Sequence, residues 1–321
     1  MSKTVLCFGE ALIDFLNSGS EQDGVLSLNQ FTQYPGGAPA NAAVAIAKLG
    51  GNAKFAGQVG DDPFGEFLKS ALNSYQVDTQ FTHTHPSAKT ALAFVFLDDE
   101  GERSFSFHRE NTADMVFNES QVNDAWFEEQ PIFHFCSNTL TESRIAQVTK
   151  NIVEQAKSQH CLISFDVNLR HNLWSAKQAD KALVNQFVMQ SDLVKFAKEE
   201  IDYLCDGQRD DYLATCFANG VKSIIITDGA NPIRICNPSK QLTIEPPRVK
   251  AVDTTGGGDA FIGAVLFGLS QGGEQRFNDL EHFSALVKFA SHCGALAVSR
   301  PGAFPAFPTF NEVKEWYREF S

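Results

Sequence analysis

The run Gly256-Gly257-Gly258-Asp259 is followed by apolar residues at helical spacing. Three successive glycines let the backbone approach a ligand closely and leave their N–H groups unobstructed. At the start of a helix, such groups favour phosphate or developing negative charge. Asp259 would lie in the first turn, where its carboxylate could accept a proton from an attacking hydroxyl or could simply complement the helix dipole. The pattern indicates an anion site beside a candidate base.

A second polar constellation stands near the start of the chain. Gly36 and Gly37 permit a tight entry into a helix, and Pro39 suits its first turn. Asn41 offers donors and an acceptor to a polyhydroxylated ligand, and Asp14 could hold two vicinal hydroxyls. Taken alone, the glycines could form a purely structural turn and Asp14 could be a turn residue.

Other classes of protein are disfavoured by motif and charge. The sequence has no P-loop, no complete G-x-G-x-x-G, no H-E-x-x-H and no G-x-S-x-G pattern. A net charge of −13 and the lack of a basic patch argue against nucleic acid and anionic membranes as partners. Seven scattered cysteines, no signal-peptide pattern and no membrane-length apolar run predict a reduced, cytoplasmic protein without disulfides or zinc.

The elements that must position these residues alternate between strand and helix, which is typical of a parallel α/β sheet covered on both faces. Two stretches, 25–31 and 104–107, instead alternate apolar and polar residues, and we expect them to form a small, separate antiparallel sheet that acts as a lid. Buried strands are predicted at 5–8, 54–59, 132–136, 162–167, 192–196 and 223–227, and helices at 39–49, 63–75, 142–159, 176–189 and 210–217.

Three motifs in order resemble the ribokinase-like, or PfkB-type, carbohydrate kinases. They are GGxxxNxAxxxxxLG at 36–50, GDDxFG at 60–65 and DTTGGGDAF at 253–261. The resemblance implies a three-layer ribokinase-like α/β fold with a mainly parallel central sheet and a small β-sheet lid. It implies one domain over 1–321, with lid strands inserted from about 15–35 and about 88–110. It also implies transfer of the γ-phosphoryl group of ATP to a sugar.

Carried onto this chain, the resemblance makes Asp259 the catalytic base and the N–H groups of Gly256, Gly257 and Gly258 an anion hole. Gly257 stands where the family usually has alanine, which should cost only helix-start rigidity. Arg170 is expected to pair with phosphate oxygens. The residues expected to bind the sugar are Asp14, Gly36, Gly37, Asn41 and Arg103.

The nucleotide and ion sites are also implied only by the resemblance. Glu200 would hold Mg²⁺ through water, and Asp253 and Thr255 would belong to a site for a monovalent cation such as K⁺. Ala197 and Pro232 depart from the family pattern in this region. The residues expected to contact ATP are Lys195, Glu200, Thr227, Gly229, Gly256, Gly258 and Ser291.

The segment 165–174, FDVNLRHNLW, is similar to fructokinases and favours a bacterial-type fructokinase. The alternatives are a kinase for an aminoimidazole riboside or another nucleoside, a kinase for 2-keto-3-deoxygluconate, and a non-catalytic sugar-binding protein. The partners are therefore a small sugar and ATP. A lid with free edges could also pair with a second copy to form a homodimer.

Overall fold

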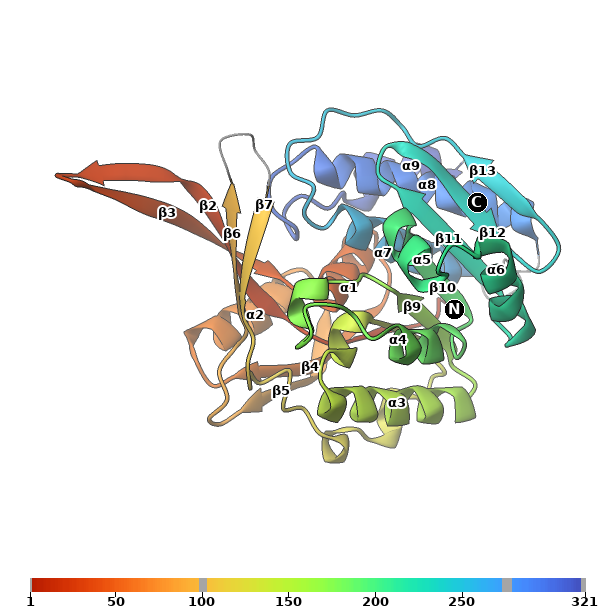
Figure 1. The fold of residues 1–321 in the computed structure, drawn as a ribbon, viewed down its shortest axis with the longest axis horizontal. Coiled ribbons are helices and arrows are strands. Elements are labelled where there is room, and N and C mark those ends of the chain that lie inside the picture. Colours follow the sequence, from red (N-terminus) through yellow and green to blue (C-terminus); the bar gives the residue numbers. More distant parts are fainter. Residues whose placement is uncertain (1, 98–102, 273–278, 319–321) are drawn as a thin grey trace.

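A large, mostly parallel sheet crosses the computed structural model, which describes residues 2–97, 103–272 and 279–318 (Figure 1). Its central strands are predominantly apolar because both faces are covered. Among the described strands of this sheet, only the last two pairings along the chain are antiparallel. Within the described residues, the strand order is β13 (Gln241–Ile244), β12 (Asn231–Cys236), β11 (Ser223–Asp228), β10 (Leu193–Ala197), β9 (Leu162–Asp166), β8 (Ile132–Cys136), β1 (Val5–Phe8), β4 (Ala53–Gly60) and β5 (Asp78–His85).

Helices pack on both faces of this sheet, so the predicted α/β class is confirmed. In β1, Val5 and Cys7 belong to one apolar cluster, whereas Leu6 and Phe8 belong to the other. The first cluster includes residues of α1 (Ala38–Lys48), α2 (Pro63–Ser74), α7 (Gly257–Gly272), α8 (Leu280–Val298) and α9 (Phe310–Arg318). The second includes residues of α3 (Ser143–Ser158), α4 (Lys181–Val188), α5 (Lys198–Leu204) and α6 (Arg209–Ala218).

One helix start differs from the prediction by more than one residue. α4 begins at Lys181 rather than at residue 176, because the side chain of Asp180 accepts a hydrogen bond from the backbone N–H of Leu183. The strands β5, β12 and β13 and the helices α5 and α9 were not predicted from the sequence.

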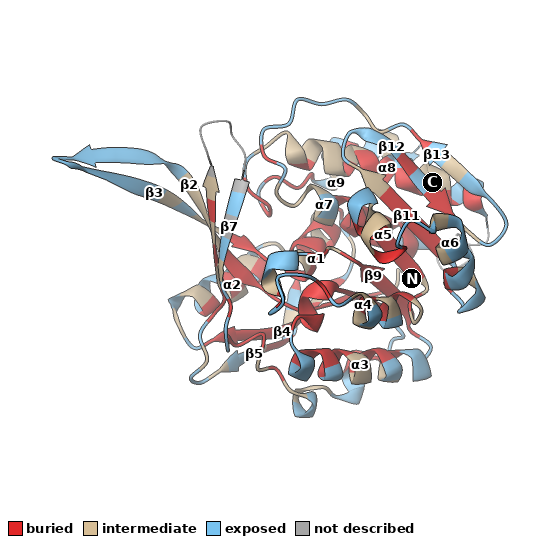
Figure 2. Cartoon of the chain, viewed as in Figure 1, coloured by how far each residue is buried: buried red, intermediate tan, exposed pale blue. Residues whose placement is uncertain are grey.

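A smaller sheet has the strand order β3 (Leu26–Gly36), β2 (Leu12–Asp23), β6 (Leu92–Leu97) and β7 (Arg103–His108). The prediction of an antiparallel sheet is wrong at its centre, where β2 and β6 pair in parallel. The outer pairs, β2 with β3 and β6 with β7, are antiparallel. Stacked and edge-on contacts among Phe15, Phe31 and Phe94 hold the two hairpins together. The far part of β2 and β3 extends from the body and is exposed (Figure 2).

All seven cysteines fall within the described residues, where each is buried and free. Across residues 2–97, 103–272 and 279–318, no helix is both long enough and apolar enough to cross a membrane. The residues DDEGE at 98–102, whose composition is typical of a turn, lie outside these ranges.

Candidate active site

The turn before α1 is built so closely that it requires glycine. Gly37, the N-cap, has a φ of 104°, and a Cβ there would overlap the backbone carbonyl oxygen of Glu10. A Cβ on Gly36 would overlap the carboxylate of Asp14. Pro39 follows in the first helical turn. The Asp14 carboxylate therefore lies directly against the turn predicted to bind a sugar.

The glycine run opens α7, with Asp259 in its first turn as predicted. Gly256 has a φ of 72°. A Cβ on Gly258 would lie 3.5 Å from the Nζ of Lys195, so the lysine ammonium stands beside the N-terminus of α7. A helix N-terminus and a neighbouring cation have the same sign of potential, and together they favour an anion.

Glycine stands at position 257 for a steric reason that the sequence did not reveal. A Cβ at this position would overlap the Cγ1 atom of Val298 on α8. The side chain of Val298 thus takes the space that an alanine methyl at 257 would need. The Val298 side chain therefore explains why this chain has glycine at 257, where the family usually has alanine. The effect of the glycine goes beyond the rigidity of the helix start.

A hydrogen bond joins the two predicted constellations. The Nδ2 of Asn41 donates to the Oδ2 of Asp259 at 2.7 Å, across 218 positions of sequence. Asn41 lies in α1 and Asp259 in α7, and these helices approach closely because their contact is lined by small residues: a Cβ on Gly263 would lie 2.6 Å from the Cβ of Ala45. The candidate sugar turn and the candidate base are therefore adjacent.

The Asp259 carboxylate is more basic than an ordinary aspartate. Its burial among protein atoms raises its pKa to about 6, and the negative charge of Asp166 acts in the same direction. The hydrogen bond from Asn41 and the positive charges of Lys195 and Arg170 lower the pKa and limit the rise. A carboxylate with a pKa near 6 is mostly ionised at pH 7 and is a stronger proton acceptor, which suits a general base.

Lys195, in the middle of β10, forms a buried ion pair with Asp166, at the carboxyl end of β9. The Nζ of Lys195 lies 2.8 and 3.0 Å from the two carboxylate oxygens of Asp166. Burial lowers the pKa of Lys195, but the charges of Asp166 and Glu200 outweigh it and hold this pKa above its ordinary value. The lysine is therefore a permanent cation at the anion site.

Glu200, the predicted magnesium residue, already holds two backbone groups. Its Oε1 accepts from the N–H of Leu169 and its Oε2 from the N–H of Ala197, each at 2.7 Å. Burial raises its pKa. Within the part of the chain that the structure describes, no group of three or more His, Cys, Asp or Glu residues could hold a metal ion. Glu200 and its neighbours would therefore bind Mg²⁺ only indirectly, through waters and the phosphates of a nucleotide. Mg²⁺ usually binds beside nucleotides in this way.

Asp253, predicted for a monovalent cation, also binds backbone. Its Oδ1 accepts from the N–H of Thr255 at 2.7 Å, and its Oδ2 accepts from the N–H of Gly302 at 2.9 Å. The buried carboxylate thereby fixes the loop before α7 to the loop after α8. Any cation at this place would use the remaining lone pairs.

The other predicted residues lie on several different elements. Arg170 is exposed just beyond β9, and its charge acts on Asp259. The hydroxyl of Thr227 donates to the carbonyl of the neighbouring strand β10, and Gly229 forms the turn after β11 with a φ of 55°. The hydroxyl of Ser291 donates within its own helix. Arg103 begins β7 by its backbone, and its side chain lies outside the described part.

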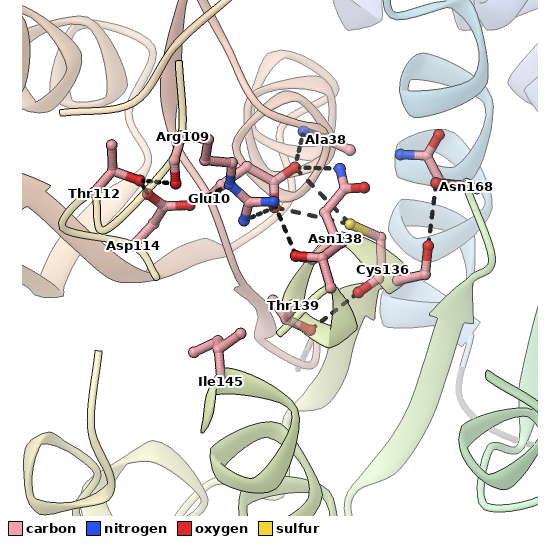
Figure 3. A network of polar contacts seen from close by, with 12 residues as sticks. Glu10, Ala38, Arg109, Thr112, Asp114, Cys136, Asn138, Thr139, Ile145 and Asn168 are labelled. Carbon is pink, nitrogen blue, oxygen red and sulfur yellow. Dashed lines mark hydrogen bonds and ion pairs between the residues drawn. The ribbon is translucent and has the colours of Figure 1, made fainter. Parts of the chain in front are cut away.

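Sequence reasoning missed a buried polar network beneath the sugar turn (Figure 3). The Oε1 of Glu10 accepts from the first N–H of α1, that of Ala38, at 3.1 Å, and from the Nδ2 of Asn138 at 2.8 Å. Arg109 lies against this cluster: its Nη1 donates to the carbonyl of Asn138 at 3.0 Å, and its Nη2 lies 3.9 Å from the Oε2 of Glu10.

Asp114 completes this network. The Nε of Arg109 donates to its Oδ2 at 2.6 Å, and the hydroxyl of Thr112 donates to its Oδ1 at 2.7 Å. The network ties the end of β1, the start of α1, the segment after β7 and the segment after β8. Its one signal in the sequence is Glu10, a charge that interrupts an apolar run.

These features define a class of protein. A mainly parallel α/β fold that brings together a raised-pKa carboxylate, a helix N-terminus with a cation and a polar glycine turn is suited to transferring a phosphoryl group to an alcohol.

The chain belongs to the pfkB family of carbohydrate kinases, which it matches over residues 2–309. It is 36% identical over 307 residues to probable fructokinase-5 of Arabidopsis thaliana, covering 95% of this chain and 94% of the relative. The crystal structure of fructokinase with bound ATP from Xylella fastidiosa is similar, with a TM-score of 0.92, 36% identity and 99% coverage of both chains. The fructose-, ADP- and calcium-bound fructokinase of Vibrio cholerae O395 has a TM-score of 0.87 and 34% identity, covering 98% of this chain and 99% of its own.

Proposed function

We propose that this chain is an ATP-dependent fructokinase, which transfers the γ-phosphoryl group of ATP to a hydroxyl of D-fructose. The observation that carries the proposal is the 2.7 Å hydrogen bond between Asn41 and Asp259, because it places the candidate base beside the candidate sugar turn. The similarity to fructokinases over nearly the whole chain supports fructose as the acceptor and ATP as the donor.

In this proposal, Asp14 and Asn41 bind the sugar while Asp259 takes the proton of its attacking hydroxyl. The hydroxyl oxygen forms a bond to the γ-phosphorus, the bond from that phosphorus to the bridging oxygen breaks, and ADP leaves. The N–H groups of residues 256–258, with Lys195 and Arg170, face the transferring group. Positioning and charge stabilisation dominate phosphoryl transfer, and these are what the chain provides.

The same proposal assigns the nucleotide and ion sites. Mg²⁺ would neutralise the phosphates of ATP, with Glu200 holding it through water, and Asp253 with Thr255 would serve a monovalent cation such as K⁺. Because both carboxylates already bind backbone N–H groups, each would contribute only its remaining lone pairs. The residues assigned to ATP are Lys195, Glu200, Thr227, Gly229, Gly256, Gly258 and Ser291.

The charges beneath the turn favour a neutral sugar over a keto-deoxy acid. A carboxylate substrate needs a cation beside the sugar turn whose charge is not already balanced by carboxylates of the protein. The buried guanidinium of Arg109 already faces two carboxylates, those of Asp114 and Glu10. An additional substrate carboxylate here would meet a cluster that is negative overall.

We further propose that residues 1–321 form one domain in which the smaller sheet is a lid, and that its edge strand β3 pairs two copies into a homodimer. Val25, Leu26 and Leu28 are exposed on this hairpin, which supports such a contact. Sedimentation at micromolar concentration tests it, and a monomer would contradict it. The seven free cysteines support a cytoplasmic location.

Turnover tests the proposed function directly. ADP release should be strongest with D-fructose among fructose, ribose, ribosides and keto-deoxy acids. Asp259→Asn should lower kcat by two or more orders of magnitude, roughly the contribution of a general base, while calorimetry still detects ATP and fructose binding. Asp279→Asn, at the exposed N-cap of α8, is the matched control and should retain activity. Faster turnover of another substrate would replace fructose, and sugar binding without any ADP formation would indicate a non-catalytic protein.

A further inference from the structure

The side-chain amide of Asn138 has a fixed orientation. Its Nδ2 lies 2.8 Å from the Oε1 of Glu10, and an ionised carboxylate can only accept, so the amide nitrogen must face Glu10. The amide oxygen then points away from Glu10, to the side on which Asn168 lies (Figure 3). Asn138 is 7% exposed, and among the described residues nothing donates to its Oδ1.

A buried carbonyl oxygen without a donor is unfavourable, typically by about 1–3 kcal/mol. Native structures therefore rarely leave one unless a ligand or an ordered water supplies the hydrogen bond. The network around Asn138 uses its other polar groups: its carbonyl accepts from Arg109 and from Thr141. Only the Oδ1 is left for a group from outside the chain.

Asn41 shows the same arrangement at the predicted sugar site. Its Nδ2 donates to a carboxylate, that of Asp259, and its Oδ1 is buried without a partner. Both asparagines adjoin the start of α1. Asn41 lies in its first turn, and Asn138 shares the Oε1 of Glu10 with the N–H of Ala38. The Oδ1 atoms of Asn41 and Asn138 thus border the same turn, and each belongs to an amide whose nitrogen donates to a carboxylate.

We propose that Asn138 is a further specificity-determining residue of the kinase reaction, whose Oδ1 accepts a hydrogen bond from one hydroxyl of the sugar. This inference rests on the proposed function and concerns the same site. Glu10 orients the amide, and Arg109 holds both Glu10 and the Asn138 backbone. A sugar hydroxyl fits this acceptor because it can donate, whereas a substrate carboxylate, which has no proton to give, would leave the Oδ1 unsatisfied.

The test combines substitutions with deoxy sugars. Asn138→Leu keeps much of the volume and removes the acceptor, and Asn138→Ala is a second variant in case the first fails to fold. kcat/KM is measured for D-fructose and for analogues that each lack one hydroxyl. The analogue that lacks the hydroxyl to be phosphorylated cannot turn over, so its Kd is measured by calorimetry instead of kcat/KM. Asn151→Leu is the matched control, because Asn151 also donates its amide to a glutamate, but on the exposed side of α3.

We expect kcat/KM for fructose to fall roughly tenfold, mainly through KM, while the KM for ATP stays within about twofold. One deoxy analogue should be equally poor with the unaltered enzyme, and Asn138→Leu should weaken it no further, since the lost contact is the same. If the variants weaken every analogue by the same factor, or weaken none, the acceptor binds water or serves only the fold, and the proposal is overturned. Should the unaltered enzyme prefer another sugar, the proposed function fails separately, and the same cycle is run with that sugar's deoxy analogues.

Discussion

Removing the Asn41 amide should shift the pH at which the enzyme becomes active. The amide donates at 2.7 Å to the Asp259 carboxylate and lowers a pKa that burial has raised to about 6. A hydrogen bond to a charged group contributes about 1.5–3 kcal/mol, and one pKa unit corresponds to about 1.4 kcal/mol. Because Asp259 is only half-buried and keeps the charges of Lys195 and Arg170, we take the lower end and expect Asn41→Ala to raise its pKa by about one unit.

The sign follows from the role of the base. Only the ionised carboxylate accepts a proton, so activity is lost as pH falls through the Asp259 pKa. With a pKa of about 6, half of the unaltered enzyme is competent at pH 6. With a pKa of about 7, about one-eleventh of the variant is competent. At pH 6, Asn41→Ala should therefore lose about fivefold more activity than it loses at pH 8.5, where both forms are ionised.

The assay is kcat/KM for fructose from pH 5 to 9 by coupled ADP release at constant ionic strength. The loss of kcat/KM at pH 8.5 measures the contribution of Asn41 to sugar binding. The displacement of the acidic limb of the pH profile measures the effect of Asn41 on the pKa of Asp259. ATP titrates identically in every variant, so it cancels in the comparison. Asn151→Ala, which also removes an amide that donates to a carboxylate, should leave the acidic limb in place. An acidic limb that stays unmoved, or moves to lower pH, would refute the reasoning.

Two glycine substitutions test the packing around the site. Gly37→Ala should lower the free energy of unfolding by about 2 kcal/mol or more, through positive φ and collision with the Glu10 carbonyl. Gly50→Ala, with a φ of 86° in open space, is its control in chemical denaturation, and an equal loss would contradict the collision. Gly257→Ala should destabilise by about 1–3 kcal/mol through overlap with Val298, and adding Val298→Ala should recover much of this in thermal melts. Additive losses in the double variant would count against that contact.

The parallel core could be predicted from the sequence because each buried strand can be recognised from its own residues, without knowing which strands it pairs with. In runs such as VLCF and IFHFC all residues but His134 are apolar, which is typical of strands in a sheet that is covered on both faces. The start of α7 could be predicted for a similar local reason, since glycines followed by a helical period mark it. The smaller sheet was harder: alternation reveals a half-exposed strand, but says nothing of whether β2 meets its neighbour in parallel.

The buried network could not be predicted, because each member looks ordinary in its own segment. Glu10, Arg109, Asp114 and Asn138 are far apart in sequence, and their charges balance only when the fold brings them together. Sequence spacing predicts periodic burial, not charge compensation between distant loops. For the same reason, Gly257 looked like a simple loss of helix propensity until Val298 was seen to fill its space.

Small residues between two helices explain how the site is held together. Asn41 and Asp259 lie in the first turns of α1 and α7, so their separation depends on how closely those helices pack. A Cβ on Gly263 would lie 2.6 Å from the Cβ of Ala45, which shows that no larger side chain fits there. Any side chain at 263 would force the helices apart, lengthening the 2.7 Å contact between amide and carboxylate. The alignment of sugar and base is therefore set partly by Gly263, about one helical turn from Asp259, since displacements of about 1 Å can reduce rates a hundredfold.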